Sequence, residues 1–365
     1  MICLTAIRSL WPFAARLRLV DHPGRRRRQG DPAVVIGGLA ITAALIAASL
    51  LFGPRYSVSA SLAAGLALIA CVGALDDALD LGYGPKFIAQ LVAAALAIGH
   101  GQMALTDLGS VDALLPVSVE SIAVPLTLLA LVGFMNAMNF LDGVDGLSAG
   151  AATIMLGYLA LAAAEAGTLG ALALAGVTIA ALAAFLLFNF PLPGRAQARV
   201  FLGDSGSLTL GLIIAWVAID VSQAPTRTIA PVVIAWILAV PVTEVVAITL
   251  RRLFTGRHPF RADRTHLHHI LLRAGFSRTA VTYLILTWVA TLGAIGWWSA
   301  ATGVSEIALL YTLGVATSPH ALMVLFPNRA IRLAGRIRTR VRGLWTPRRR
   351  RVNAAQPPPK PGSRR

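Results

Sequence analysis

The sequence is poor in both cysteine and charge. Its 365 residues include only 2 cysteines, Cys3 and Cys71, and Asp, Glu, Lys and Arg together make up 13% of the chain. Two cysteines provide no disulfide framework, and a soluble globular domain typically has about 25% charged residues. The shortage of charge therefore excludes an ordinary soluble domain. Hydrophobic residues instead account for 56% of the chain.

These apolar residues are gathered in long stretches. About 20 apolar residues in a helix cross a hydrocarbon core of about 30 Å, and a helix satisfies its own backbone N–H and C=O groups there. The sequence therefore predicts an all-α, polytopic membrane protein with about 10 transmembrane helices. The predicted spans are residues 34–52, 57–75, 87–104, 122–140, 148–166, 170–190, 206–221, 230–250, 280–300 and 305–326.

Acidic residues are scarce relative to basic ones, with 16 Asp and Glu against 32 Lys and Arg, so the formal net charge is +16. In a soluble protein this would suggest nucleic acid. Here the basic residues flank the spans, where they set orientation. If the span at 34–52 runs outward, every Lys and Arg except Arg55 and Arg227 lies on one side. We therefore assign both ends and the polar loops to the cytoplasm, and expect anionic lipids, not nucleic acid, as partners.

The chain divides into three parts. Residues 1–33 form a basic N-terminal segment, which we interpret as an interfacial helix or a truncated first span. Residues 34–326 form the transmembrane domain and contain the polar motifs. Residues 327–365 form a basic tail, which we expect to be largely disordered or to lie on the membrane surface, because its composition cannot bury a core.

Two adjacent carboxylates follow one apolar run. They are Asp76 and Asp77, with Lys86 downstream. Ionisable groups at the edge of a span are costly and are candidates for function. Neighbouring carboxylates also need a cation beside them, which Lys86 or a divalent metal could provide. The alternative interpretation is a solvated turn that closes a helix.

Amide and carboxylate side chains recur at three-residue spacing in Asn136, Asn139 and Asp142. On a helix they fall on roughly one face, and the Asp-Gly steps that begin at Asp142 and Asp145 indicate that the helix gives way to a turn. Oxygen ligands of this kind suit Mg²⁺. A helix cap with an Asx turn would explain only two of the four residues Asn136, Asn139, Asp142 and Asp145.

A short run of small residues, from Gly203 to Ser207, precedes another span. Small residues allow close approach to a ligand, and the start of a helix offers free N–H groups to an anion. Asp204 could cap this helix or bind a metal that bridges to phosphate. No histidine lies nearby in the sequence to activate Ser205, so a serine hydrolase fits poorly.

Four of the seven histidines fall between residues 258 and 269. Such a cluster could bind zinc. However, no cysteine lies near it, and Arg264 would repel a cation. Arginine and histidine together favour recognition of phosphate.

These stretches, together with Asp21–Arg28 and Gly37-Gly38, resemble in their order the polyprenyl-phosphate N-acetylhexosamine-1-phosphate transferases, the WecA/MraY family. The resemblance runs from about Asp21 to Gly275. It implies that residues 34–326 are a catalytic domain in the bacterial inner membrane. Members of the family transfer a sugar 1-phosphate from a UDP-sugar to a polyprenyl phosphate, release UMP and use Mg²⁺, for which Mn²⁺ could substitute.

The resemblance implies a role for each motif. It implies catalytic roles at the phosphates for Asp76, Asp77 and Lys86, and Mg²⁺ binding by Asn139 and Asp204. Phe201 matches an aromatic residue that stacks on uracil. For the rest of the nucleotide sugar it implies binding by Asp142, Asp145, Arg264, His266, His268 and His269.

The histidine loop resembles the version found in enzymes that use UDP-N-acetylglucosamine. The expected reaction is therefore transfer of N-acetylglucosamine 1-phosphate to undecaprenyl phosphate, with another UDP-N-acetylhexosamine as the alternative, and a homodimer is a possible assembly. The sequence departs from the family at Gln29, where His is usual, at Val34, where Pro is usual, and in its short first span. The competing class is a membrane transporter, whose charges would lie near the bilayer midplane.

Overall fold

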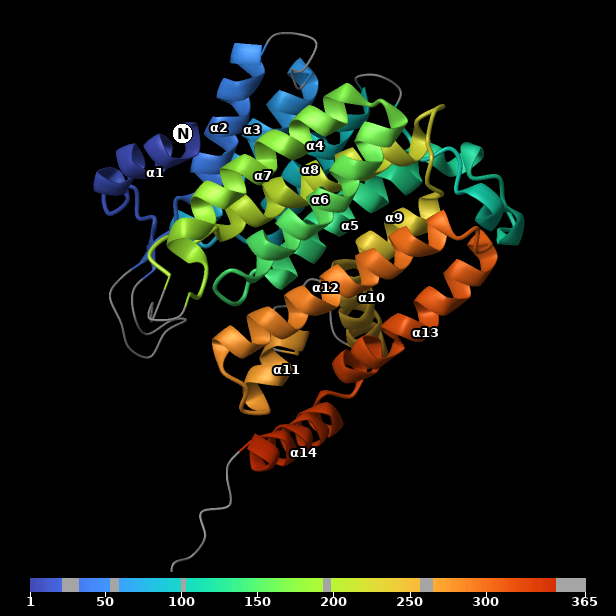
Figure 1. Ribbon diagram of the computed structural model, residues 1–365. Helices are drawn as coiled ribbons and strands as arrows, with labels where there is room; N and C mark the ends of the chain where they lie inside the picture. The colour runs from blue at the N-terminus through green and yellow to red at the C-terminus, as the bar shows by residue number, and fades with distance from the viewer. Residues whose placement is uncertain (22–32, 53–58, 100–102, 193–197, 257–264, 346–365) are drawn as a thin grey trace, which may run out of the picture.

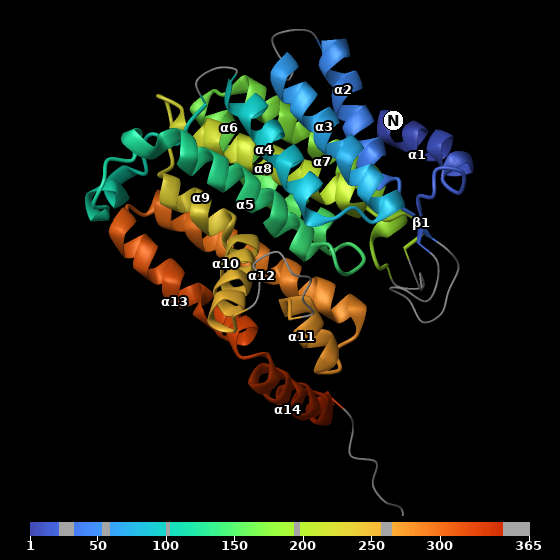
Figure 2. The same ribbon diagram turned by 180° about the vertical axis from the view of Figure 1, so that it is seen from behind.

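The computed structural model describes residues 1–21, 33–52, 59–99, 103–192, 198–256 and 265–345. Nearly all of these residues are helical, and the helices form a bundle with both short strands at one end (Figures 1 and 2). The helices that match the predicted spans are α2 (Gly37–Phe52), α3 (Ala60–Leu79), α4 (Tyr83–Gly99), α5 (Ala123–Leu141), α6 (Leu147–Ala166), α7 (Leu169–Asn189), α8 (Gly203–Gln223), α9 (Pro231–Ile237) with α10 (Ala239–Phe254), α12 (Arg278–Ala301) and α13 (Glu306–Leu325).

The remaining elements are short or lie outside the bundle. They are α1 (Ile2–Leu10), η1 (Trp11–Phe13), β1 (Val20–Asp21), β2 (Ala33–Val34), η2 (Gly109–Leu114), η3 (Glu120–Ile122), α11 (Leu267–Arg273) and α14 (Pro327–Trp345). The 9 residues of α1 are too few to cross a bilayer and pack against α2 and α7.

The predicted all-α membrane architecture is confirmed. Seven of the described helices are long and apolar enough to cross a membrane, and the pair α9 and α10 adds an eighth if it is one broken span. The other two predicted spans are shorter helices, with 16 residues in α2 and 17 in α4. Helix α4 also begins earlier than predicted, which brings Lys86 into its first turn.

The span predicted at 230–250 is not one straight helix. Helices α9 and α10 meet at Leu238 with a bend of 79°. Pro241 explains the break, because it lacks the N–H that would donate to the carbonyl of Ile237 in a continuous helix. Of the basic tail, expected to be largely disordered or on the membrane surface, the first part is a helix, α14; residues 346–365 lie outside the described residues.

Helix α8 lies in the middle of the bundle and is the most buried of the long helices, whereas α13 is the most exposed (Figures 1 and 2). Glycines permit the close packing of α8 against its neighbours. A Cβ on Gly38 of α2 would lie 2.1 Å from the backbone nitrogen of Gly206, and a Cβ on Gly211 would lie 2.5 Å from the Cα of Met135 in α5. Small residues at helix contacts are the usual means of close packing in membranes. This contact explains the Gly37-Gly38 pair in the sequence.

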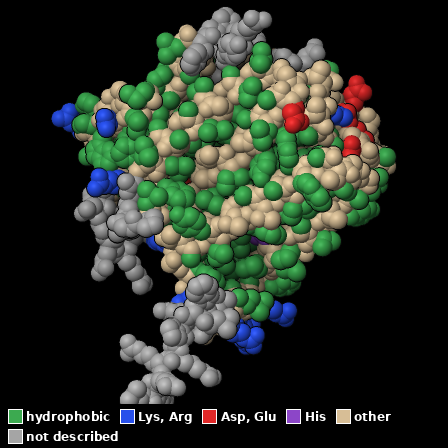
Figure 3. Space-filling view, viewed as in Figure 1, with side chains coloured by type: hydrophobic (Ala, Val, Ile, Leu, Met, Phe, Trp, Pro, Cys, Tyr) green, Lys and Arg blue, Asp and Glu red, His purple; other side chains and the backbone are tan. Residues whose placement is uncertain are grey.

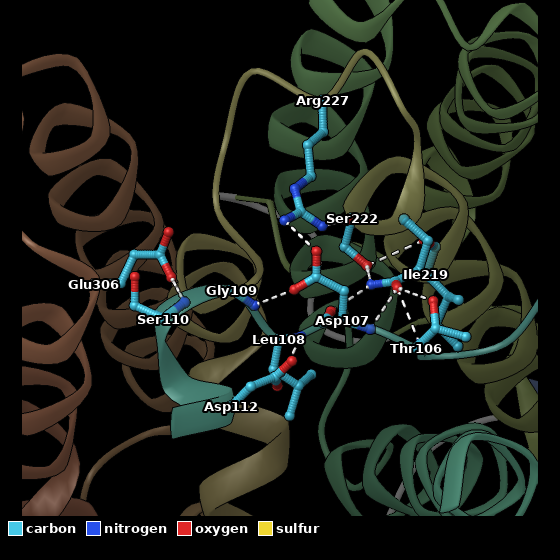
Figure 4. Close-up of polar contacts among 11 residues, drawn as sticks. Thr106, Asp107, Leu108, Gly109, Ser110, Asp112, Ile219, Ser222, Arg227 and Glu306 are labelled. Atoms are coloured by element: carbon cyan, nitrogen blue, oxygen red, sulfur yellow. Dashed lines mark hydrogen bonds and ion pairs between the residues drawn. The ribbon is translucent and has the colours of Figure 1, made fainter. Parts of the chain in front are cut away.

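Charged side chains gather at the two ends of the molecule, with a largely apolar surface between them (Figure 3). At one end, the segment between α4 and α5 is held by polar contacts (Figure 4). Arg227 Nη2 lies 2.6 Å from Asp107 Oδ2, and the backbone N–H of Ser110 donates to Glu306 across 2.6 Å. The N–H of Gly109 and the Arg227 guanidinium lower the pKa of Asp107. This segment is therefore an ordered connection among α8, η2 and α13.

Candidate active site

Five of the predicted site residues meet at the ends of four helices. They are Asp76 and Asp77 in the last turn of α3, Lys86 in the first turn of α4, Asn139 in the last turn of α5, and Asp204 in the first turn of α8. We call this group the acid cluster. Lys86 Nζ lies 2.8 Å from Asp76 Oδ2 and 3.2 Å from Asp204 Oδ2. The Asn139 amide donates to Asp204 Oδ1 across 2.9 Å.

The two adjacent acids face different partners. Asp77 accepts hydrogen bonds from the backbone N–H groups of Asp204 and Ser205, at 2.9 and 3.3 Å. It thereby satisfies two donors that the start of α8 leaves without helical partners. Asp76 instead faces Lys86, and its Oδ1 is buried without a hydrogen-bond partner among the described residues. Asp77 thus positions Asp204, whereas Asp76 retains a free oxygen.

Glycines allow α3 to approach the start of α8 this closely. A Cβ on Gly73 would lie 2.4 Å from the Cα of Ser205, and a Cβ on Gly203 would lie 2.4 Å from Asp77 Oδ2. Gly203 also has a φ of +73°, which favours glycine over residues with a Cβ. The small residues that precede this span therefore serve helix packing around the acid cluster.

The acid cluster has more negative than positive groups. It contains three carboxyl groups and one ammonium, which contacts Asp76 and Asp204, and the exposed fractions of the Asp76, Asp204 and Lys86 side chains are 10%, 19% and 25%. A second cation would offset this imbalance. In the described ranges, no three His, Cys, Asp or Glu side chains form a ready-made metal cage. Mg²⁺ needs only one or two carboxylates when phosphate and water supply the other ligands, so these oxygen donors fit it.

The end of α5 lies between the acid cluster and a group formed by His266, His268 and His269, which we call the histidine motif. Asn139 contacts Asp204 on one side, whereas the ring centroid of the next residue, Phe140, lies 5.0 Å from that of His266. A Cβ on Gly143, in the turn that follows, would lie 2.1 Å from His268 Nε2. The Asp-Gly turn that the sequence indicated thus packs directly on the histidine motif.

A buried glutamate that sequence reasoning missed fixes this motif. Glu244 of α10 is only 1% exposed. Its Oε1 accepts the backbone N–H of Leu267 at 3.0 Å and lies 3.2 Å from His266 Nδ1, and its Oε2 lies 2.5 Å from Nε2 of His320 in α13. The only sequence signal was a single acid inside a predicted span, which is itself unusual.

His268 lies beneath the turn after α5 and is buried, with no hydrogen-bond partner for its Nε2 among the described residues. Burial lowers the pKa of His268 to about 3, and the nearby His269 and His266 act in the same direction. His268 is therefore neutral at pH 7. It can offer shape or a hydrogen bond to a ligand, but no positive charge.

We expect His268 to make the fold sensitive to mild acid. Its pKa is about 3 in the folded chain and about 6.5 when unfolded, so only the unfolded chain takes up this proton as the pH falls below about 6.5. Its stabilising contribution is complete above that pH and declines as the pH falls towards 3. His268→Gln should therefore lose less thermal stability between pH 7 and pH 5 than the native chain. Equal pH slopes in detergent-solubilised protein would contradict this assignment.

Two other predicted ligands, Asp145 and Phe201, are held by hydrogen bonds of the segment that leads into α8. Asp145 accepts the N–H of Ala198 at 3.2 Å. The backbone N–H of Phe201 donates to the carbonyl of Val34 at 2.8 Å. Val34 in turn donates its N–H to the carbonyl of Arg199, a hydrogen bond that proline could not form. Asp142 lies half-buried in the turn after α5.

Asn189 joins two of these segments and was not singled out from the sequence. Its side chain accepts the N–H of Gly146 at 2.7 Å and donates to the carbonyl of Val200 at 2.8 Å. It therefore ties the Asp-Gly turn to the segment before α8. Arg264 and Gln29 lie outside the described residues, as do Arg55 and residues 22–28.

The sequence of this chain is similar to those of known proteins. Residues 59–222, which include the acid cluster, match glycosyl transferase family 4. The chain is 31% identical over 286 residues to the undecaprenyl-phosphate alpha-N-acetylglucosaminyl 1-phosphate transferase of Escherichia coli strain K12, a match that covers 78% of this chain and 77% of the relative. Proteins of the same name from Yersinia pestis and Haemophilus influenzae are each 30% identical, over 78% of this chain and over 77% and 81% of their own lengths.

Proposed function

The chain belongs to glycosyl transferase family 4, and on that premise we propose that it transfers N-acetylglucosamine 1-phosphate from UDP-N-acetylglucosamine to undecaprenyl phosphate, releasing UMP. The observation that carries the proposal is the convergence of Asp76, Lys86, Asn139 and Asp204 from four helix ends. A lipid phosphate must approach a pyrophosphate that has the same sign of charge. Charge neutralisation and positioning therefore dominate the chemistry.

In this reaction an oxygen of the lipid phosphate attacks the β-phosphorus of the UDP-sugar. The bond from that phosphorus to the oxygen bridging the α-phosphate breaks, and UMP leaves. Lys86 lies between Asp76 and Asp204 and supplies one positive charge where the phosphates meet. Asp204 and Asn139 would hold Mg²⁺, which when bound neutralises phosphate charge.

The two acids divide the work in this proposal. One buried oxygen of Asp76, beside Lys86, has no hydrogen-bond partner among the described residues, so Asp76 can accept the proton or a hydrogen bond of the lipid phosphate. Asp77 is committed to the backbone of α8, where it holds Asp204 in place. We therefore assign contact with the lipid phosphate to Asp76 and positioning to Asp77.

We assign the nucleotide sugar to the opposite side of the α5 end. The packing of Phe140 on His266 and of Gly143 against His268 supports this, because it puts the histidine motif next to the turn after α5. The residues assigned to the donor are Asp142, Asp145, Phe201, Arg264, His266, His268 and His269. Since His268 is neutral at pH 7, positive charge for the pyrophosphate must come from other groups, Arg264 among them.

We place this site on the cytoplasmic side of the bacterial inner membrane. The support is the distribution of Lys and Arg along the sequence, because only Arg55 and Arg227 of the 32 fall in loops that the alternation of spans assigns to the other side of the membrane. The acid cluster at the ends of the spans is also where a lipid headgroup phosphate would lie. A transporter would instead place its charges near the bilayer midplane.

Transfer of the sugar together with its phosphate is the decisive expectation. Membranes that contain the protein should move both labels from UDP-N-acetylglucosamine, one in the sugar and one in the β-phosphate, to undecaprenyl phosphate in equal amounts. Added UMP should reverse the step, since one phosphoanhydride is exchanged for another. Other UDP-N-acetylhexosamines, offered in parallel, test the sugar. If the sugar reaches the lipid and the β-phosphate label stays in solution, the proposed reaction is wrong.

A further inference from the structure

Five arginines line one cavity of about 630 Å³ between α11 and α14, which opens widely at the protein surface. They are Arg273, Arg332, Arg336, Arg338 and Arg340. None of the described residues that line this cavity is acidic. We call it the arginine cavity; it is formed by residues far from the acid cluster in sequence.

No acidic side chain among the described residues compensates the charge in the arginine cavity. Within the described part of the chain, none of its five guanidinium groups forms an ion pair with an acidic side chain. Like charges gathered in this way repel one another. Guanidinium groups bind phosphate through paired, charge-assisted hydrogen bonds, so a phosphate-bearing anion is the ligand that this chemistry fits.

The position of α14 indicates where that phosphate comes from. Helix α14 follows directly after the last span, α13, and packs against α11 (Figures 1 and 2). Outside the cavity lining, α14 exposes Leu333 and Ile337, four residues apart and so on one face, with 60% and 52% of each side chain exposed. A basic helix that follows a span and exposes apolar side chains is typical of the membrane surface, where phospholipid headgroups supply the phosphate.

From this geometry we propose that the arginine cavity binds the headgroup phosphate of an anionic phospholipid. Helix α11 connects the cavity to the histidine motif, because Arg273 at its end lines the cavity and the histidines lie at its start. Arg273 stands in the last turn of α11, and His268 and His269 stand in its first turn. Seven residues of helix span only about 10 Å, so a headgroup bound at one end of α11 fixes the element whose other end holds the motif. This last step, unlike the binding itself, rests on the proposed function.

Lipid binding can be measured without substrates. The full-length protein is placed in nanodiscs of phosphatidylcholine with increasing phosphatidylglycerol, and the phosphatidylglycerol that remains bound after transfer to detergent is counted by native mass spectrometry. Arg336→Glu should weaken retention by about tenfold or more, because it removes a charge-assisted contact and adds a repelling charge. The matched control is Arg329→Glu, two turns away on the same helix, exposed and outside the cavity lining, which should have little effect.

Three outcomes decide the proposal. Selective loss with Arg336→Glu supports it, and Arg273→Gln on α11 should then reproduce the loss if α14 itself is disturbed by the first variant. Equal weakening by Arg329→Glu and Arg336→Glu would mean diffuse attraction to the membrane and overturn it. Full competition by inorganic phosphate, with no dependence on phosphatidylglycerol, would overturn the lipid as the source of the phosphate. None of these readouts depends on transferase activity, so failure here is distinct from failure of the proposed reaction.

Discussion

Asp204→Asn should abolish transferase activity while the protein still folds and inserts. Asp204 lies between Lys86 and Asn139, at 3.2 and 2.9 Å, and is the carboxylate we assign to Mg²⁺. The substitution keeps the shape of the side chain and removes its charge, so both the cation and Lys86 lose their common partner. We expect the initial rate of label transfer to fall by about 10³-fold or more, the range seen when one preorganised electrostatic contact to a transition state is removed.

A neighbouring aspartate provides the matched control. Asp80 follows α3, is exposed, and has a positive φ of +57°, which asparagine tolerates at least as well. Asp80→Asn makes the same chemical change in the same region and should leave the rate nearly unchanged. Activity close to native for Asp204→Asn at saturating Mg²⁺ would remove Asp204 from the site. Equal loss in both variants would point instead to a general effect of charge at this surface.

The sequence was informative about the acid cluster because ionisable groups are rare in an apolar chain. Asp76, Asp77, Lys86, Asn139 and Asp204 each stood out as polar residues at the edge of a predicted span, and the structure brings all five together. The different orientations of the two adjacent acids could not be predicted. They depend on how closely α3 approaches α8, which is a property of the packed bundle and not of either helix alone.

Other features escaped prediction for physical reasons of their own. The break at Leu238 lies inside an unbroken apolar run, and hydropathy does not respond to the N–H that Pro241 lacks. The basic tail was judged by composition, although Ala330 and Ala334 are buried at helical spacing in α14. The bond between Glu244 and His320 joins residues 76 positions apart, so neither pattern nor spacing could indicate it.

Glu244→Ala should be the most destabilising single substitution among the polar residues described above. Both carboxylate oxygens of Glu244 are engaged, one by His266 and the N–H of Leu267 and the other by His320, in a site that is almost fully buried. Removing one partner from a buried polar pair leaves the others without compensation and typically costs about 3–5 kcal/mol. We expect a loss of this size in the free energy of unfolding, measured by titration with dodecyl sulfate.

The same substitution at an exposed acid controls for the loss of a glutamate as such. Glu165 of α6 is exposed and bonded only to Thr228 within the described residues, at 2.9 Å, so Glu165→Ala should change the free energy of unfolding by no more than about 0.5 kcal/mol. If Glu244→Ala is as mild as Glu165→Ala, the buried carboxylate does not hold α10, α11 and α13 together.

Stability and catalysis can then be separated with Glu244→Gln. Glutamine retains an oxygen that can accept the N–H of Leu267, so the fold should survive, but it removes the charge that orients His266. A residue that only stabilised the fold would leave the kinetics of the surviving protein unchanged. We expect instead a higher KM for the UDP-sugar, by about tenfold, because His266 belongs to the donor side of the site.

Because Glu244 also contacts His320, the double variant Glu244→Gln/His320→Asn should be less destabilised than the sum of the two single variants. Strict additivity would show that α13 takes no part in fixing the histidine motif.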